Sequence, residues 1–140
     1  MAIPPAPITG VLETVLYASD LTAARRFYAG ALGLEHISGD GTLSLGFRVA
    51  PGAVLLIFDP EMSGRPGRDL PSHGVDGPGH LAFRITPESC DGWLNRLRGA
   101  GVAIEHEEHW DRADPADPRS IYVRDPAGNS VELITADIWA

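Results

Sequence analysis

Three ionisable side chains stand where strand alternation predicts burial. Glu13 lies among Val, Leu and Tyr residues, His80 opens the run His-Leu-Ala-Phe-Arg-Ile, and Glu132 lies within Ser-Val-Glu-Leu-Ile. An ionised carboxylate inside an apolar sheet is costly unless it is paired, hydrogen-bonded or bound to a metal ion. Two carboxylates and one imidazole suit one divalent cation, whose charge offsets their repulsion. The pattern therefore predicts a metal site formed by Glu13, His80 and Glu132.

Each of these residues also has an ordinary structural explanation. A single Glu on a strand is usually a solvated edge residue, and His80 fits a hydrogen-bonded histidine of a core. The three residues occupy related places in an internal repeat, however, so one shared metal site explains them together.

The elements that carry these residues occur twice along the chain. Hydrophobic periodicity and turn residues predict strands at 8–18, 35–38, 42–49 and 54–58 and a helix at 22–32. The second copy comprises strands at 79–86, 102–106, 120–124 and 130–135 and a helix at 87–99. Superposing Glu13 on His80 also aligns Phe27 with Leu94, and 54–57 matches 131–134.

A half-repeat of this size cannot bury both faces of its sheet alone, so two must pair. We predict an α+β fold in which two βαβββ modules form a curled mixed sheet around a cleft, with the helices outside. Module 1 spans about 8–58, a linker or loop covers 59–78, and module 2 spans about 79–135. Residues 1–140 are expected to form a single domain.

Composition narrows the class of partner. The 140 residues carry a formal net charge of -8, and no basic cluster is present, so nucleic acid is an unfavourable ligand. No apolar run is long enough to cross a bilayer, and the first residues do not form a secretory signal. We therefore expect a cytoplasmic protein whose partners are a small molecule and a second copy of the chain.

Three segments resemble one known family, the vicinal-oxygen-chelate superfamily of glyoxalases, bleomycin resistance proteins and extradiol dioxygenases. LETVLYASDLTAARRFYAGALGL is similar to the family's opening strand and helix. GPGHLAFRI resembles the opening of its second module, and YVRDPAGNSVEL its closing turn and strand. The resemblance spans nearly the whole chain. It implies metal ligands at Glu13, His80 and Glu132, and a homodimer whose clefts combine modules from two chains.

The resemblance further implies a divalent-metal-dependent enzyme of the glyoxalase type. A zinc, nickel, cobalt, manganese or iron ion would act as a Lewis acid on a small substrate with two neighbouring oxygens. A ligand carboxylate, Glu132 or Glu13, is then the candidate catalytic base for lyase, isomerase or nucleophile-addition chemistry. One alternative is a metal-free protein that sequesters a drug, as bleomycin resistance proteins do. Another is a ring-cleaving dioxygenase.

Two departures from the family pattern shape these expectations. The first-strand ligand is often His or Gln in the family, and here it is Glu13. The four-ligand glyoxalase pattern also requires an acidic or amide residue at the end of the first module, where this chain has Leu55. We therefore expect three protein ligands. The two histidines and one carboxylate of the extradiol dioxygenases are not reproduced, which disfavours the dioxygenase hypothesis.

Neighbours on the same strand face as the proposed ligands are the candidates for substrate contacts. They are Tyr17, Phe47, Arg84, Ser120 and Tyr122. Arg84 suits an anionic substrate group, or else a salt bridge with an acidic residue. Tyr122 suits donation to a substrate oxygen, or else burial in the core. The loop residues His73, His106, His109 and Trp110 either close over a ligand or are solvated.

Overall fold

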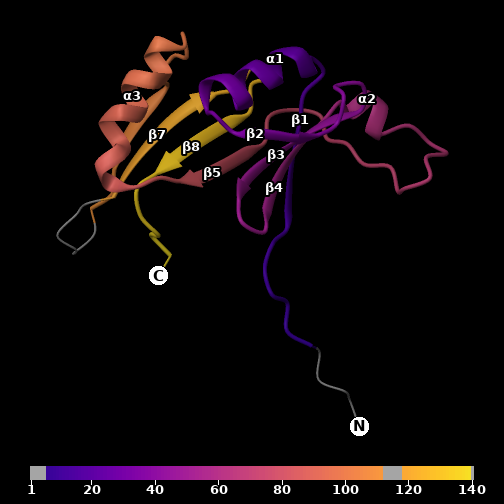
Figure 1. Ribbon diagram of the computed structural model, residues 1–140, viewed down its shortest axis with the longest axis horizontal. Coiled ribbons are helices and arrows are strands. Elements are labelled where there is room, and N and C mark those ends of the chain that lie inside the picture. The colour runs from indigo at the N-terminus through magenta and orange to yellow at the C-terminus, as the bar shows by residue number, and fades with distance from the viewer. Residues whose placement is uncertain (1–5, 112–117, 140) are drawn as a thin grey trace.

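The computed structural model describes residues 6–111 and 118–139, and these residues form two modules with the same order of elements (Figure 1). The elements of the first module are β1 (Glu13–Tyr17), α1 (Leu21–Arg25), the π-helical turn η1 (Arg26–Ala31), β2 (Glu35–Ser38), β3 (Ser44–Ala50) and β4 (Ala53–Phe58). After the short helix α2 (Pro60–Ser63), the second module contains β5 (His80–Arg84), the 3-10 turn η2 (Pro87–Ser89), α3 (Cys90–Gly99), β6 (His106–His109), β7 (Arg119–Arg124) and β8 (Ser130–Ile134).

Each module builds one four-stranded mixed sheet. The first sheet has the order β1-β4-β3-β2, and the second has the equivalent order β5-β8-β7-β6. In both sheets the first strand of the module pairs in parallel with the last, and the other pairs are antiparallel. The predicted α+β fold of two equivalent modules is confirmed. Across residues 6–111 and 118–139, however, the two sheets are separate and do not close around one cleft.

Helices cover one face of the sheets, as Figure 1 shows for α1 and α3. The predicted helix at 22–32 is present as α1 followed by η1. Asp20 caps it, because its Oδ1 accepts a hydrogen bond from the backbone N–H of Ala23 at 2.9 Å. Gly33 follows the helix at φ 72°, a left-handed conformation that glycine adopts without a Cβ penalty.

The sixth strand differs from the prediction. Residues 102–106 were expected to form a strand and 107–118 a loop, whereas β6 starts at His106 and ends at His109. Its sequence, His-Glu-Glu-His, shows no hydrophobic alternation, because β6 is an edge strand that pairs only with β7. Val102 and Ile104 pack against the core from an irregular segment instead.

A buried hydrogen-bond network joins the two modules. The Asn129 side chain donates from Nδ2 to the carbonyl of Tyr17 at 3.0 Å and accepts from the N–H of Gly79 at 2.7 Å. Asn129 also donates to Asp125, which accepts from the hydroxyl of Tyr28 at 2.7 Å. Burial, and then the charge of Asp125, hold the pKa of Tyr28 far above its usual value. We call these residues the Asn129 joint.

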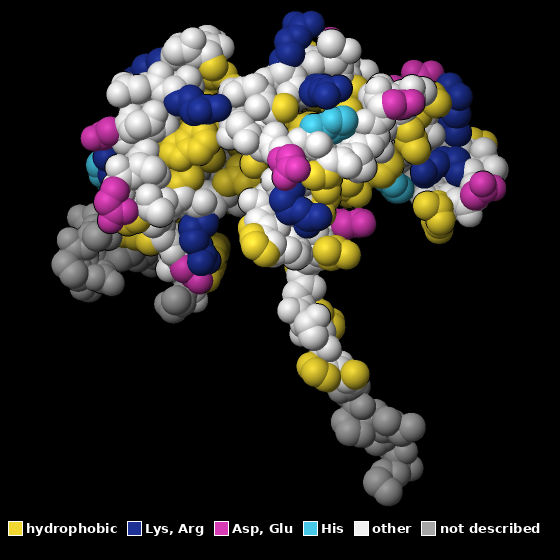
Figure 2. All heavy atoms as spheres, viewed as in Figure 1, with side chains coloured by type: hydrophobic (Ala, Val, Ile, Leu, Met, Phe, Trp, Pro, Cys, Tyr) yellow, Lys and Arg dark blue, Asp and Glu magenta, His cyan; other side chains and the backbone are white. Residues whose placement is uncertain are grey.

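Large apolar side chains also lie at the surface. Ile8, Val11 and Leu12 are exposed on the extended segment that precedes β1, and Figure 2 shows apolar groups along this segment. Over the residues that the structure describes, no helix combines the length and the apolar character that a bilayer crossing requires.

Candidate functional site

Strands β5, β8 and β7 bring the predicted residues of the second module onto one face. In the register of these strands, His80 lies opposite Ser130, and Glu132 lies between Ala82 and Tyr122. Successive side chains of a strand point to opposite faces of the sheet. These residues therefore share the face opposite to the one from which the neighbouring Val131 and Leu133 enter the hydrophobic core, where both are buried.

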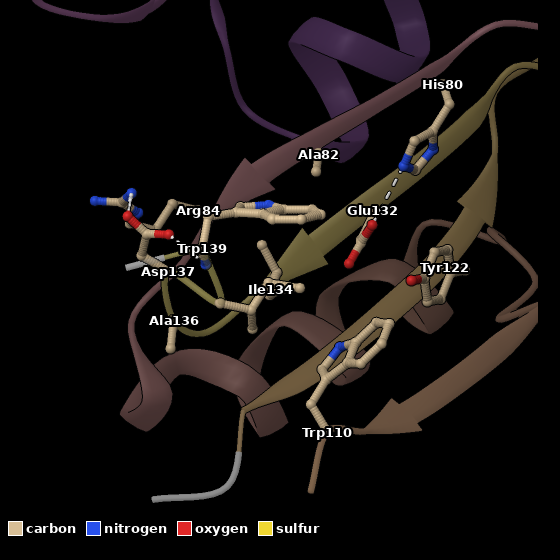
Figure 3. Close-up of a pocket in the computed structure, with 11 residues that line it drawn as sticks. His80, Ala82, Arg84, Trp110, Tyr122, Glu132, Ile134, Ala136, Asp137 and Trp139 are labelled. Carbon is tan, nitrogen blue, oxygen red and sulfur yellow. Dashed lines mark hydrogen bonds and ion pairs between the residues drawn. The ribbon is translucent and has the colours of Figure 1, made fainter. Parts of the chain in front are cut away.

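His80 and Glu132 form the centre of this face. The Nε2 atom of His80 lies 3.3 Å from Oε1 of Glu132 (Figure 3). Glu132 is buried, with 6% of its surface exposed, whereas about half of the His80 side chain is exposed. The Nδ1 atom of His80 lies 3.1 Å from the carbonyl oxygen of Ser130. Nδ1 also lies 3.2 Å from the hydroxyl oxygen of Ser130, so its role depends on the tautomer. In the tautomer in which Nδ1 donates to the carbonyl, Nε2 presents a lone pair to Glu132.

In this tautomer two atoms with lone pairs face one another, His80 Nε2 and Glu132 Oε1. Such a pair is stable when a proton or a metal cation lies between the two atoms. Ligand atoms about 2.0–2.2 Å from a tetrahedral or octahedral cation lie roughly 3.0–3.5 Å from each other. The observed separation of 3.3 Å falls within this range. The residues present thus fit two neighbouring positions of a divalent cation.

The second carboxylate oxygen of Glu132, Oε2, accepts a hydrogen bond from a buried side chain. The hydroxyl of Ser120 donates to Oε2 of Glu132 at 2.6 Å, and Nε1 of Trp110 donates to the Ser120 oxygen at 2.8 Å. Ser120 is almost fully buried, with 1% of its surface exposed. This contact leaves Oε1 as the oxygen of Glu132 that faces His80.

A cavity of about 450 Å³ opens beside this pair. It is lined by His80, Ala82, Arg84, Trp110, Tyr122, Glu132, Ile134, Ala136, Asp137, Ile138 and Trp139. In Figure 3 the polar pair and Tyr122 lie at one end of the cavity, Arg84 and Asp137 at the other, and the two indoles between them. Burial, and then the nearby charge of Glu132, raise the pKa of Tyr122, so its phenol stays protonated at neutral pH and can donate a hydrogen bond.

At the far end of the cavity, Arg84 forms a salt bridge with Asp137. The guanidinium of Arg84 lies 3.5 Å from the carboxylate of Asp137, and both side chains are exposed. Arg84 was expected to bind an anionic substrate group or to form a salt bridge, and the structure shows the salt bridge. An exposed pair of this kind contributes at most about 1 kcal/mol, so an anionic group could replace Asp137.

The candidates of the first module lie elsewhere. Glu13 is exposed on β1, and the part of the chain that the structure describes contains no cluster of three or more His, Cys, Asp or Glu side chains suited to a metal ion. Tyr17 forms a hydrogen bond of 2.7 Å with Nδ1 of His73 and lines a different hollow. Within one chain, the structure therefore brings together His80 and Glu132 but not Glu13.

Phe47 needs a correction. It is fully buried and lies 5.7 Å from Tyr28, measured between ring centroids, on the helix-covered face of the first sheet. Its strand neighbours Gly46 and Arg48 point to the opposite face of β3, where Gly46 is buried and Arg48 is exposed. Phe47 is a core residue, and it does not line the cavity beside Glu132.

The repeat alignment was one residue out of register at the last strand. The structural pairing matches Glu132 with Leu56, because Glu13 lies opposite Val54 as His80 lies opposite Ser130. Leu55 instead points into the core, where it is fully buried. A shift of one residue exchanges the two faces of a strand. The residue at the place of a fourth ligand is thus Leu56, which is also apolar.

The C-terminal part of the cavity was not predicted. Ala136, Asp137, Ile138 and Trp139 follow β8 and line the cavity, although Trp139 is 91% exposed. This segment has no periodicity that would have placed it. Only the presence of Trp139 could have indicated a role in binding, because an indole outside the core is often part of a binding surface.

Comparison with known proteins gives the same fold and a family. The model of the Glyoxalase/Bleomycin resistance protein/Dioxygenase superfamily matches residues 10–133. The crystal structure of lactoylglutathione lyase from Agrobacterium tumefaciens is similar, with 36% sequence identity, a TM-score of 0.85, and coverage of 96% of this chain and 98% of that one. A glyoxalase/dioxygenase from Nostoc punctiforme has 25% identity and a TM-score of 0.68, with 96% and 95% covered.

A third structure with the same fold is that of an antibiotic resistance protein. It is a variant of the fosfomycin resistance protein FosX from Listeria monocytogenes, complexed with Mn(II) and 1S,2S-dihydroxypropylphosphonic acid. Its identity to this chain is 24% and its TM-score is 0.68, with 94% of each chain covered. The family model covers residues 10–133, and the fold of the lactoylglutathione lyase agrees over 96% of the chain. This chain belongs to the Glyoxalase/Bleomycin resistance protein/Dioxygenase superfamily.

Proposed function

We propose that the chain acts as one domain and is a divalent-metal-dependent enzyme of the glyoxalase type. Its substrate would be a small molecule with two neighbouring oxygens. The observation that carries the proposal is the pair of His80 Nε2 and Glu132 Oε1, which face each other at 3.3 Å beside a cavity. The likeness to a lactoylglutathione lyase at 36% identity supports lyase or isomerase chemistry.

The chain's own residues suit a proton transfer next to a carbonyl group. A bound divalent cation would supply Lewis-acid stabilisation of negative charge on the substrate oxygens. The carboxylate of Glu132 or Glu13 would accept a proton from the carbon beside the carbonyl and return it to the carbonyl carbon, while the proton of the substrate hydroxyl moves to the former carbonyl oxygen. The protonated phenol of Tyr122 would donate a hydrogen bond to a substrate oxygen, and the indole of Trp110 would cover one side of the bound substrate.

Metal removal and reloading test this proposal. We expect the purified protein to bind about one divalent ion per chain and to isomerise a hemithioacetal of a 2-oxoaldehyde to the 2-hydroxy thioester. Chelation should abolish turnover, and adding back manganese, nickel, cobalt, zinc or iron one at a time should restore it. Protein that takes up no ion after dialysis against each of these metals would contradict the enzyme proposal.

We further propose that Glu13 completes the site from a second copy of the chain. Glu13 is exposed on the open face of the first sheet, and among the described residues the site of the second sheet would take two ligands, His80 and Glu132, from its own chain. The exposed Ile8, Val11 and Leu12 before β1 give a second copy an apolar surface to contact.

Mixing two variants tests the shared site. Glu13→Ala and His80→Ala should each bind metal poorly, because each homodimer would lack one ligand at both sites. A mixed dimer would contain one site with both ligands intact, so unfolding and refolding the two variants together should recover part of the metal binding. Glu35→Ala is the matched control, since Glu35 lies in the same row of this sheet at the opposite edge. If mixing recovers nothing, Glu13 is not shared between chains.

The aromatic lining of the cavity favours a second candidate function, the sequestration of a small molecule without chemistry. Trp110, Tyr122 and Trp139 offer faces for a flat apolar or cationic compound, and the net charge of -8 favours a cation. Metal content distinguishes the two candidates, because sequestration requires no cation between His80 and Glu132. The dioxygenase hypothesis has less support, since His80 is the one histidine among the described residues of the cavity lining.

A further inference from the structure

We propose that Ser120 and Trp110 are positioning residues for the metal site. Together they hold the Glu132 carboxylate so that one oxygen points to Nε2 of His80. The inference rests on the function proposed above and adds two residues outside the ligand set. It starts from the chain of hydrogen bonds in which Trp110 donates to Ser120 at 2.8 Å and Ser120 donates to Glu132 at 2.6 Å.

The direction of these bonds is fixed by the number of protons. An indole Nε1–H can only donate, so the Ser120 oxygen accepts from Trp110. The hydroxyl has one proton, and Trp110 fills an acceptor position of its oxygen. That proton therefore points to Oε2 of Glu132. The ionised carboxylate is the natural acceptor, and a hydrogen bond to a charged oxygen is about twice as strong as a neutral one.

The carboxylate needs such a restraint. The last torsion of a glutamate is broad, with no sharp staggered minimum, so packing alone does not fix how the two oxygens are turned. Ser120 is 1% exposed and Glu132 is 6% exposed, which leaves little room for solvent to take over this contact. When Ser120 holds Oε2, Oε1 is left at 3.3 Å from the histidine nitrogen.

Trp110 also contacts the cavity, in addition to its hydrogen bond with Ser120. Its indole forms part of the cavity wall, as Figure 3 shows, while its backbone N–H donates to the carbonyl of Pro118 at 2.8 Å. The residue is thus anchored next to the start of β7, the strand that carries Ser120. A molecule in the cavity that contacts the indole also contacts the group that orients Glu132. Occupation of the cavity and orientation of the carboxylate are coupled through one side chain.

A double-mutant cycle on Mn(II) affinity, measured by isothermal titration calorimetry on the full chain, tests the proposal. We expect Ser120→Ala to weaken Mn(II) binding roughly 10- to 100-fold, the usual effect of losing a group that orients a ligand. Trp110→Phe should weaken it by a smaller factor. The double variant should bind like Ser120→Ala alone, because Trp110 acts through Ser120. Ser120→Thr keeps the hydroxyl and should restore most of the affinity.

Trp93→Phe is the matched control, since Trp93 lies on α3 and does not line this cavity. Its affinity should equal that of the wild type. Wild-type affinity in both Ser120→Ala and Trp110→Phe would overturn the positioning role alone, as would additive effects in the double variant. No Mn(II) binding by the wild type would overturn this proposal together with the proposed function. If Ser120→Ala does not fold, the comparison of Trp110→Phe with Trp93→Phe gives the answer.

Discussion

His80→Ala and Glu132→Gln are each expected to weaken divalent metal binding by more than about 100-fold, because each removes one of the two neighbouring ligand atoms. Glutamine has the size of glutamate and can still accept from Ser120, so Glu132→Gln removes the charge with little change in packing. Metal content by elemental analysis and affinity by calorimetry would measure the loss.

His106→Ala is the control for this prediction. His106 lies on β6 next to Tyr122, in the same row of the sheet, and its Nε2 is already 2.7 Å from a carboxylate oxygen of Glu108. Its removal should leave the metal affinity unchanged. Wild-type metal content in either His80→Ala or Glu132→Gln would show that the pair does not bind the metal.

Asp125→Ala is expected to lower the free energy of unfolding by about 3–5 kcal/mol, because it removes the centre of the buried Asn129 joint. Asp125 accepts hydrogen bonds from the hydroxyl of Tyr28, the side chain of Asn129 and the backbone N–H groups of Ala127 and Asn129. Truncation leaves several of these donors buried without a partner, and the Tyr28 side chain is fully buried.

Chemical denaturation monitored by circular dichroism would measure this loss. Asp91→Ala is the matched control, since Asp91 is largely exposed and its contact with Arg119 is long, at 3.4 Å. The control should change stability by less than about 1 kcal/mol. A similarly small change for Asp125→Ala would mean that the joint contributes little to holding the modules together.

Sequence reasoning located the second-module half of the site because a strand has a strict period of two. Once the strand boundaries were near correct, parity placed Arg84 beside His80 and Ile134 beside Glu132, and the register of β5 and β8 agrees. Ser120 and Tyr122, the further candidates on the preceding strand, lie on the same face. The same reasoning needed no knowledge of the turn lengths. Whether these residues bind metal or substrate stays a prediction.

The alternation of faces gave a wrong alignment in β4, where no polar residue distinguishes one register from the other. The repeat alignment paired Glu132 with Leu55, one residue from its structural counterpart Leu56, because runs of apolar residues in β4 look alike in either register. Edge strand β6 escaped prediction because its residues are polar on both faces. Trp110 and Trp139 reach the cavity from irregular segments, where local sequence does not specify a direction.

The Asn129 joint also limits how the molecule can move. Asn129 donates across the boundary between the modules to the carbonyl of Tyr17, and Tyr28 of the first module donates across it to Asp125. A hinge motion of one sheet against the other would have to break these bonds in a place where water does not replace them. Slow exchange of ligands with solvent would therefore depend on the segments that border the cavity, 136–139 above all, while the two sheets keep their relative orientation.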